Sequence, residues 1–220
     1  MHLTSRFAVL AVITASTFAA HADTVYSTFG PGQAFDVGSP FAIGAIASLN
    51  QVIAAPFVPT ETVTLTDAIL AMRQFSGTTP VNVYIESGAG GVPGSILDAL
   101  TQVGSMTSTP SLVDFICSSC SVLDAGTTYF MVAQQSNPSD ESGWQLSLGP
   151  NATIYDNQVA SATGPWEQGP DSPTGAFEVN GTPAATGTPA ATPEPSSLIL
   201  LGTGIVGLAA VARRKLISRS

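Results

Sequence analysis

The sequence predicts an all-β fold, an antiparallel β-sandwich of jelly-roll type. Residues 23–181 alternate apolar and polar side chains in short runs, which is the period of strands with one buried face. Turn-forming sequences such as Gly30-Pro31-Gly32 separate these runs. Outside the two chain ends no stretch has the pattern of a three-turn amphipathic helix, and the best one, 95–103, is short. These three observations together favour a sandwich over any helical or mixed fold.

About ten strands are expected, in one domain of roughly 160 residues with a single core. The clearest strand patterns cover 62–66, 81–86, 128–133, 144–148 and 176–179. Weaker patterns cover 25–29, 41–45, 51–58, 69–75, 112–117 and 154–155.

The charge of the chain is divided by segment. The whole sequence has 15 acidic and 6 basic residues, a net charge of −9. Residues 23–195 hold all the acids and a single base, Arg73, so their net charge is −14. Nucleic-acid binding is therefore excluded, because phosphate contacts need clustered Lys and Arg.

Catalytic residues are also scarce. Both histidines, His2 and His21, lie in the first 22 residues, and the only Lys is Lys215. Catalytic triads and His-ligated metal sites would therefore lack their bases and ligands once that segment is removed. We predict no catalytic residue and no enzyme activity.

The N-terminal residues 1–22 have the pattern of a secretory signal peptide. Arg6 supplies a positive start, and 7–20 is an apolar and small-residue run. Ala20 and Ala22 form the A-x-A pattern that signal peptidase recognises, so the mature chain would begin at Asp23. The alternative is a buried N-terminal helix.

The C-terminus carries a second apolar segment, 196–212, followed by the basic residues Arg213, Arg214 and Lys215. At about 1.5 Å per residue the segment reaches roughly 25 Å, slightly short of a hydrocarbon core of about 30 Å. The basic residues lie on one side only, which predicts a transmembrane helix with a cytoplasmic tail and residues 23–195 outside.

Pro193, Glu194 and Pro195 stand immediately before this segment. The tripeptide, the apolar span and the basic stop-transfer residues, in this order, resemble the PEP-CTERM sorting signal of bacterial surface proteins. The resemblance implies processing by an exosortase after an inner-membrane intermediate. The protein would then reside in the envelope, at the cell surface or in the extracellular matrix of an exopolysaccharide-producing Gram-negative bacterium. The alternative is an ordinary single-pass anchor.

In residues 182–192 the sequence Thr-Pro-Ala-Ala-Thr occurs twice with a period of six, which favours an extended linker that cannot bury a core. The expected organisation is therefore a signal peptide at 1–22, an ectodomain at 23–181, a stalk at 182–192 and a sorting signal at 193–220.

The ectodomain also resembles a family. The segment 83–87 with Gly91-Val92-Pro93-Gly94, and later 123–130, is similar to two elements of the choice-of-anchor R domain. This resemblance implies a bacterial surface domain attached by interchangeable anchors, with no general catalytic residues.

Cys117 and Cys120 are the only cysteines. A zinc site lacks further ligands, and a redox motif would need a helix after the pair, which the sequence does not predict. The interpretation we favour is a small structural disulfide formed in an oxidising compartment.

Several acids fall in or near predicted loops. They are Glu86, Asp140, Glu141, Asp156, Glu167 and Asp171. Three interpretations are open: a solvated acidic surface, calcium binding with ligands that the sequence does not name, and a catalytic pair of the glycosidase kind. The first is the one we favour.

The aromatic residues indicate a candidate sugar-binding face. Flat rings stack on pyranose sugars, and Tyr26, Tyr84 and Tyr155 could line such a face. We expect Trp144 in the core and Trp166, in a loop by composition, as an exposed glycan contact. Arg73 should pair with an acid on a neighbouring strand.

Two functions follow from these patterns. The first is a non-enzymatic structural or adhesive component of the exopolysaccharide layer. The second is a carbohydrate-binding, or less readily carbohydrate-hydrolysing, module that calcium stabilises.

Overall fold

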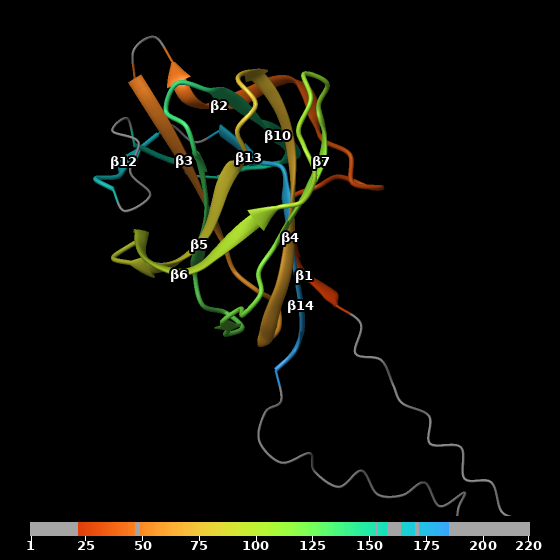
Figure 1. The fold of residues 1–220 in the computed structure, drawn as a ribbon. Helices are drawn as coiled ribbons and strands as arrows, with labels where there is room; N and C mark the ends of the chain where they lie inside the picture. The colour runs from red at the N-terminus through yellow and green to blue at the C-terminus, as the bar shows by residue number, and fades with distance from the viewer. Residues whose placement is uncertain (1–21, 47–48, 153, 158–163, 170–171, 185–220) are drawn as a thin grey trace, which may run out of the picture. The chain divides into compact units, whose positions relative to one another are not determined.

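The computed structural model describes residues 22–46, 49–152, 154–157, 164–169 and 172–184 (Figure 1). Every regular element in these ranges is a strand. The strands are β1 Asp23–Ser27, β2 Asp36–Ile46, β3 Leu49–Phe57, β4 Val63–Ser76, β5 Val81–Ala89, β6 Val92–Gln102, β7 Ser111–Ile116, β8 Val122–Leu123, β9 Tyr129–Gln135, β10 Glu141–Ala152, β11 Tyr155–Asn157, β12 Glu167–Gln168, β13 Ser172–Gly175 and β14 Phe177–Pro183. The pairings between these strands are antiparallel, so the prediction of an antiparallel all-β fold is confirmed.

The sheet closes on itself. The strand path runs β4-β7-β6-β5-β9-β3-β2-β10, and β10 then returns to pair with β4. Trp144 of β10 shows the closure, because it lies opposite Phe41 of β2 on one side and Met72 of β4 on the other. A closed sheet therefore replaces the jelly-roll sandwich that the sequence pattern predicts.

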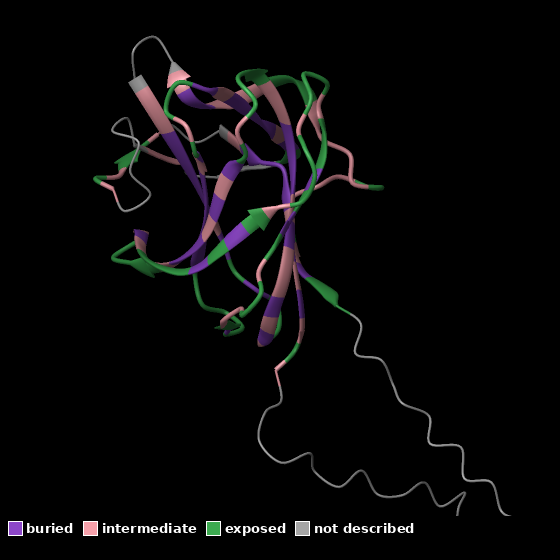
Figure 2. Cartoon of the chain, in the orientation of Figure 1, coloured by how far each residue is buried: buried purple, intermediate pink, exposed green. Residues whose placement is uncertain are grey.

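The main core lies inside this closed sheet. Buried and less buried residues alternate along the strands, as Figure 2 shows in purple and pink. The largest fully buried side chains are those of Trp144, Phe57, Phe115, Phe130 and Phe177. All but Phe130 belong to the one large cluster, which strands from every part of the ring supply.

One long strand replaces two predicted ones. β4 joins the predicted runs 62–66 and 69–75 through a bulge at Thr66, since Leu65 pairs with Gly181 and Asp67 pairs with Asn180. The extra residue shifts the phase of the alternation, because Val63 and Leu65 are buried before the bulge and Ala68 and Leu70 after it. The strand therefore continues through a point where the alternation in the sequence breaks.

β6 covers the stretch that comes nearest to a helical pattern. Gly90 and Gly91, both with positive φ, form the turn that joins it to β5. Leu97 is an extra residue in the ladder, because Ile85 pairs with Asp98 and Glu86 with Ile96. The bulge breaks the period of two and leaves consecutive apolar side chains exposed. The sequence of β6 therefore lacks the alternation that predicts a strand.

The predicted signal peptide, transmembrane helix and basic tail lie outside the described residues. In the part of the chain that the structure describes, no helix is long and apolar enough to cross a membrane. β14 pairs with β4 as far as Pro183, two positions beyond the expected end of the ectodomain at 181.

Candidate functional site

The outer face of β3, β5 and β9 carries a second, smaller hydrophobic cluster. We call it the outer aromatic face. Its buried members are Val52, Ala54, Phe130 and Val132, and Tyr84, Tyr155 and Trp166 pack against them. These side chains belong to strands whose other face lines the main core, so the sheet is covered on both sides here.

The register of the strands explains why these residues meet. Ala54 lies opposite Tyr155 of β11 on one side and Val132 of β9 on the other. Val132 in turn lies opposite Tyr84 of β5. The rings of Phe130 and Tyr155 contact edge to face, with centroids 5.5 Å apart. Residues of four strands, β3, β5, β9 and β11, are thus aligned across one surface.

Trp166 is partly buried, packed against this cluster, where the sequence predicts an exposed loop residue. Its indole Nε1 is buried and has no hydrogen-bond partner among the described residues. The structure brings Tyr84, Tyr155 and Trp166 together on one face, as the aromatic prediction requires. Tyr26 belongs elsewhere, because it packs in the main core against Phe57 and Phe177.

Trp144 is fully buried, which confirms its predicted place in the core. Its Nε1 donates a hydrogen bond of 3.1 Å to the carbonyl oxygen of Ala176. This hydrogen bond offsets the cost of removing the buried indole N–H from water, so Trp144 is a structural residue.

Glu86 is the unusual acid of the outer aromatic face. It lies opposite Phe130 in the β5–β9 ladder and is fully buried. Neither carboxyl oxygen has a hydrogen-bond partner among the residues described. Burial raises the pKa of Glu86 to about 7, because the charged form loses its hydration. The sequence pattern places this acid near a loop and gives no sign of its burial, because the alternation of β5 assigns it only to the outer side of the sheet.

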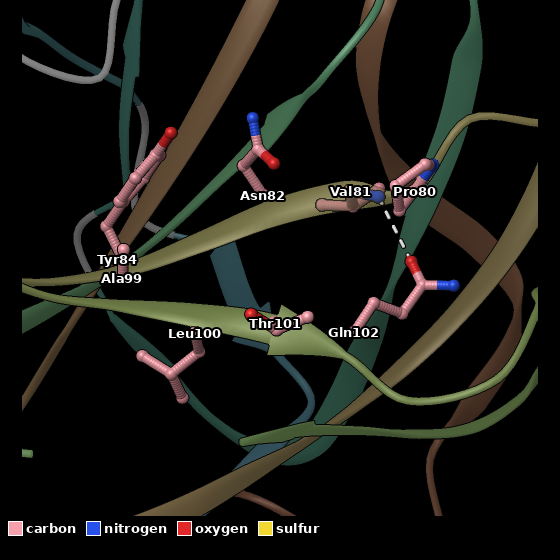
Figure 3. A pocket seen from close by; sticks show the side chains of 8 residues that line it. All are labelled: Pro80, Val81, Asn82, Tyr84, Ala99, Leu100, Thr101 and Gln102. Carbon is pink, nitrogen blue, oxygen red and sulfur yellow. Dashed lines mark hydrogen bonds between the residues drawn. The ribbon is translucent and has the colours of Figure 1, made fainter. Parts of the chain in front are cut away.

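A groove runs beside Tyr84 on β5 and β6. It has a volume of about 220 Å³, and Figure 3 shows Tyr84 and Asn82 projecting to the same side of β5. Gln102 closes one end, where its side-chain Oε1 accepts a hydrogen bond of 3.0 Å from the Val81 amide. A second hollow of about 480 Å³ shares Pro80 and Gln102 with it and extends to Met106. We call the two together the Tyr84 groove.

Asp140 holds two loops together. Its carboxylate accepts hydrogen bonds from the Thr78 and Thr79 amides, the Thr79 hydroxyl and the Asn137 side chain. These bonds, the Thr79 hydroxyl first among them, lower the pKa of Asp140. The nearby Gly77 has φ of 77°, and a Cβ there would overlap the carboxylate. Asp140 therefore fixes the β4–β5 connection to the β9–β10 connection.

Two of the other predicted loop acids are neighbours, because Asp156 of β11 lies opposite Glu167 of β12 in the ladder. Asp156 also accepts a hydrogen bond from Gln51. Glu141 stands apart in β10, and Asp171 lies outside the described residues. No group of three or more His, Cys, Asp or Glu able to hold a metal ion is found among the residues that the structure covers.

Cys117 and Cys120 are joined by a disulfide, with their Cα atoms 5.7 Å apart. The short loop that they close is held to β6 by Asp98. This buried carboxylate accepts hydrogen bonds from the amide and hydroxyl of Ser121. The pair therefore forms a local clip at the end of β7.

Arg73 differs from its prediction. Its guanidinium lies over the ring of Phe75, 4.3 Å from the centroid, and the structure gives it no ion pair with any described acid. The prediction that Arg73 pairs with an acid on a neighbouring strand is therefore wrong for the described part of the chain. A cation–π contact takes its place.

The observation that decides where the protein goes lies after the last strand. The family model described as the PEP-CTERM protein-sorting motif matches residues 191–215. The chain carries a PEP-CTERM sorting motif. The match includes Pro193, Glu194 and Pro195 as well as Arg213, Arg214 and Lys215, so the predicted resemblance of this segment is confirmed.

The PEP-CTERM motif indicates an exported protein that exosortase processes and that resides in the cell envelope or at its surface. The match covers none of residues 23–181, so the resemblance of that part of the chain to the choice-of-anchor R domain stays a prediction. A comparison with curated proteins finds no match.

Proposed function

We propose that this protein is a non-enzymatic component of the exopolysaccharide layer, where it has a structural or adhesive role. The sorting motif at 191–215 carries the proposal, because it directs the chain to the surface on which such a layer forms. Signal peptidase and exosortase are the processing partners.

The chemistry of the ectodomain supports a role without catalysis. Residues 23–195 contain no histidine, and their one base, Arg73, stacks on Phe75. Their net charge of −14 favours solubility and repulsion between copies over binding of anionic polymers.

A second candidate function is carbohydrate binding, with calcium stabilising the loops. The grouping of Tyr84, Tyr155 and Trp166 on one face favours it, since aromatic rings stack on the flat faces of sugars. A rise in Tm on calcium titration, reversed by a chelator, is the expected result for the calcium part.

Mass spectrometry of the mature protein from an exosortase-containing host tests the main proposal. We expect a C-terminus near the tripeptide 193–195 and a surface location in fractionated cells. The double variant Pro193→Ala/Pro195→Ala should remain full length and stay in the inner membrane. Pro189→Ala is the matched control, because it changes a proline of the stalk outside the motif. A mature native chain that still ends at Ser220 would contradict the proposal.

A further inference from the structure

The Tyr84 groove differs from the rest of the domain in its charge. The residues that line its first part are Pro80, Val81, Asn82, Tyr84, Ala99, Leu100, Thr101 and Gln102. None of them is ionisable at neutral pH, and none of those lining the second part is either. In an ectodomain with 14 acids between residues 23 and 178, this is an uncharged surface within an acidic one.

The groove also presents polar groups without protein partners. The side chains of Asn82, Tyr84 and Thr101 make no hydrogen bond to any residue that the structure describes. They come from adjacent strands, and Asn82 and Tyr84 project to one side of β5 (Figure 3). An amide, a phenol and a hydroxyl offer donors and acceptors at once, which is what a ligand rich in neutral hydroxyl groups requires.

Other polar side chains that line the groove already have hydrogen-bond partners in the protein. Gln102 bonds the Val81 amide and the Gly104 carbonyl, so its orientation is set by the protein. The Thr79 hydroxyl in the second part donates to Asp140, which is itself buried. A ligand would therefore meet a wall that is organised before it binds, at a low cost in conformational entropy.

A flat aromatic surface completes the site. Tyr84 is half-buried, and its ring packs against the outer aromatic face on one side while it lines the groove. A ring held in this way can stack on a pyranose face without losing rotamer freedom on binding. The two hollows together have the size of a small-ligand site.

We propose that the Tyr84 groove binds a neutral oligosaccharide, with Tyr84 as the stacking surface and Asn82 and Thr101 as hydrogen-bonding groups. The inference rests on the surface location given under Proposed function and deepens its adhesive role, since it names the ligand class and the site. An anionic polysaccharide is disfavoured, because the groove has no base and the surrounding domain is strongly negative.

Isothermal titration of the full chain in detergent micelles tests this site. The probes are neutral hexasaccharides of glucose, mannose and galactose, together with a hexasaccharide of uronic acid. We expect binding of at least one neutral probe and none of the anionic one. Tyr84→Ala should weaken binding at least tenfold, Asn82→Ala at least threefold, and Tyr84→Phe by less than threefold, because the ring remains.

Leu112→Ala is the control, because Leu112 is exposed on β7, away from the groove. Circular dichroism of each variant checks the fold, and Asn82→Ala keeps the test valid if Tyr84→Ala unfolds. The proposal is overturned by native protein that binds no neutral probe, by equal binding of the anionic probe, or by loss of binding only in Trp166→Ala. C-terminal processing is read separately by mass spectrometry, so a failure of sorting is distinguishable from a failure of this site.

Discussion

Glu86 lies directly opposite Phe130 in the β5–β9 ladder, and its carboxyl is buried without a hydrogen-bond partner among the described residues. Paired residues on one face of an antiparallel ladder are about 5 Å apart at Cβ, so the acid shares its surroundings with an aromatic ring. This environment favours the protonated form of the Glu86 carboxyl. The free energy of unfolding should therefore depend on pH.

The first prediction concerns pH. Burial raises the pKa of Glu86 to about 7, whereas in the unfolded chain it titrates near 4.5. The contribution of Glu86 to the free energy of unfolding is therefore fully present below the unfolded pKa and is lost as pH rises toward about 7. The loss is on the order of 3 kcal/mol in the free energy of unfolding. Urea unfolding between pH 4 and pH 8 measures it.

Glu86→Gln should remove most of this pH dependence, because an amide does not titrate. The variant should be more stable than the native protein at pH 8 and about equal to it at pH 4. Glu61→Gln is the control, since Glu61 is an exposed glutamate. Identical pH profiles of the native protein and Glu86→Gln would rule out a buried acid at this position.

The second prediction concerns Asp140. Its hydrogen bonds hold its pKa below the usual range, so its stabilising effect is present above the unfolded pKa and lost as pH falls through the folded one. Asp140→Asn should lower Tm at pH 7, because the amide cannot accept the full set of hydrogen bonds. Asp114→Asn, at an exposed position of β7, should leave Tm nearly unchanged. Equal Tm values for the two variants would contradict the loop-fixing role.

The third prediction concerns Gly175, which lies against the indole of Trp144. A Cβ at Gly175 would overlap the six-membered ring, so Gly175→Ala should cost about 1–3 kcal/mol. In a Trp144→Phe background the cost should fall, since the smaller ring vacates part of that space, and a double-mutant cycle measures this coupling. Gly149→Ala is the matched control, because no heavy atom would come closer than 3.8 Å to its Cβ. Full additivity would show that the contact does not matter.

The fourth prediction concerns the disulfide. Cys117 and Cys120 close a loop with a sequence separation of 3, so the chain-entropy gain is small, about 2 kcal/mol. Reduction, or Cys117→Ser/Cys120→Ser, should lower the free energy of unfolding by about that amount while the β-sheet circular dichroism signal remains. Loss of most of that signal on mild reduction would show that the clip is essential to the fold.

Local periodicity was enough to predict most strands, because half-buried strands such as β14 keep a regular alternation of buried and less buried residues. It failed where bulges insert a residue, at Thr66 in β4 and Leu97 in β6, since one extra residue reverses the phase. Local periodicity also could not predict that the sheet closes on itself. The pairing of Trp144 with both Phe41 and Met72 joins segments that are distant in sequence and carries no local signal.

The site was predictable in part. The aromatic types pointed to Tyr84, Tyr155 and Trp166, and the register of four strands gathers them as expected. The burial of Glu86 and the uncharged groove depend on which side chains cover the outer face, and that is a tertiary property. The sorting motif was fully predictable, because a linear signal is read from the chain itself.

The pairing of the first strand with the last sets an order of events during export. Thr24 of β1 bonds Asn180 of β14 across 156 residues, and β1 has no other neighbouring strand in the described sheet. A chain that crosses the membrane from its N-terminus must therefore deliver nearly the whole ectodomain before β1 finds its partner. The last strand, β14, ends at Pro183, eight positions before the matched motif begins at residue 191. The sheet is therefore complete only when the residues just ahead of that motif have been delivered.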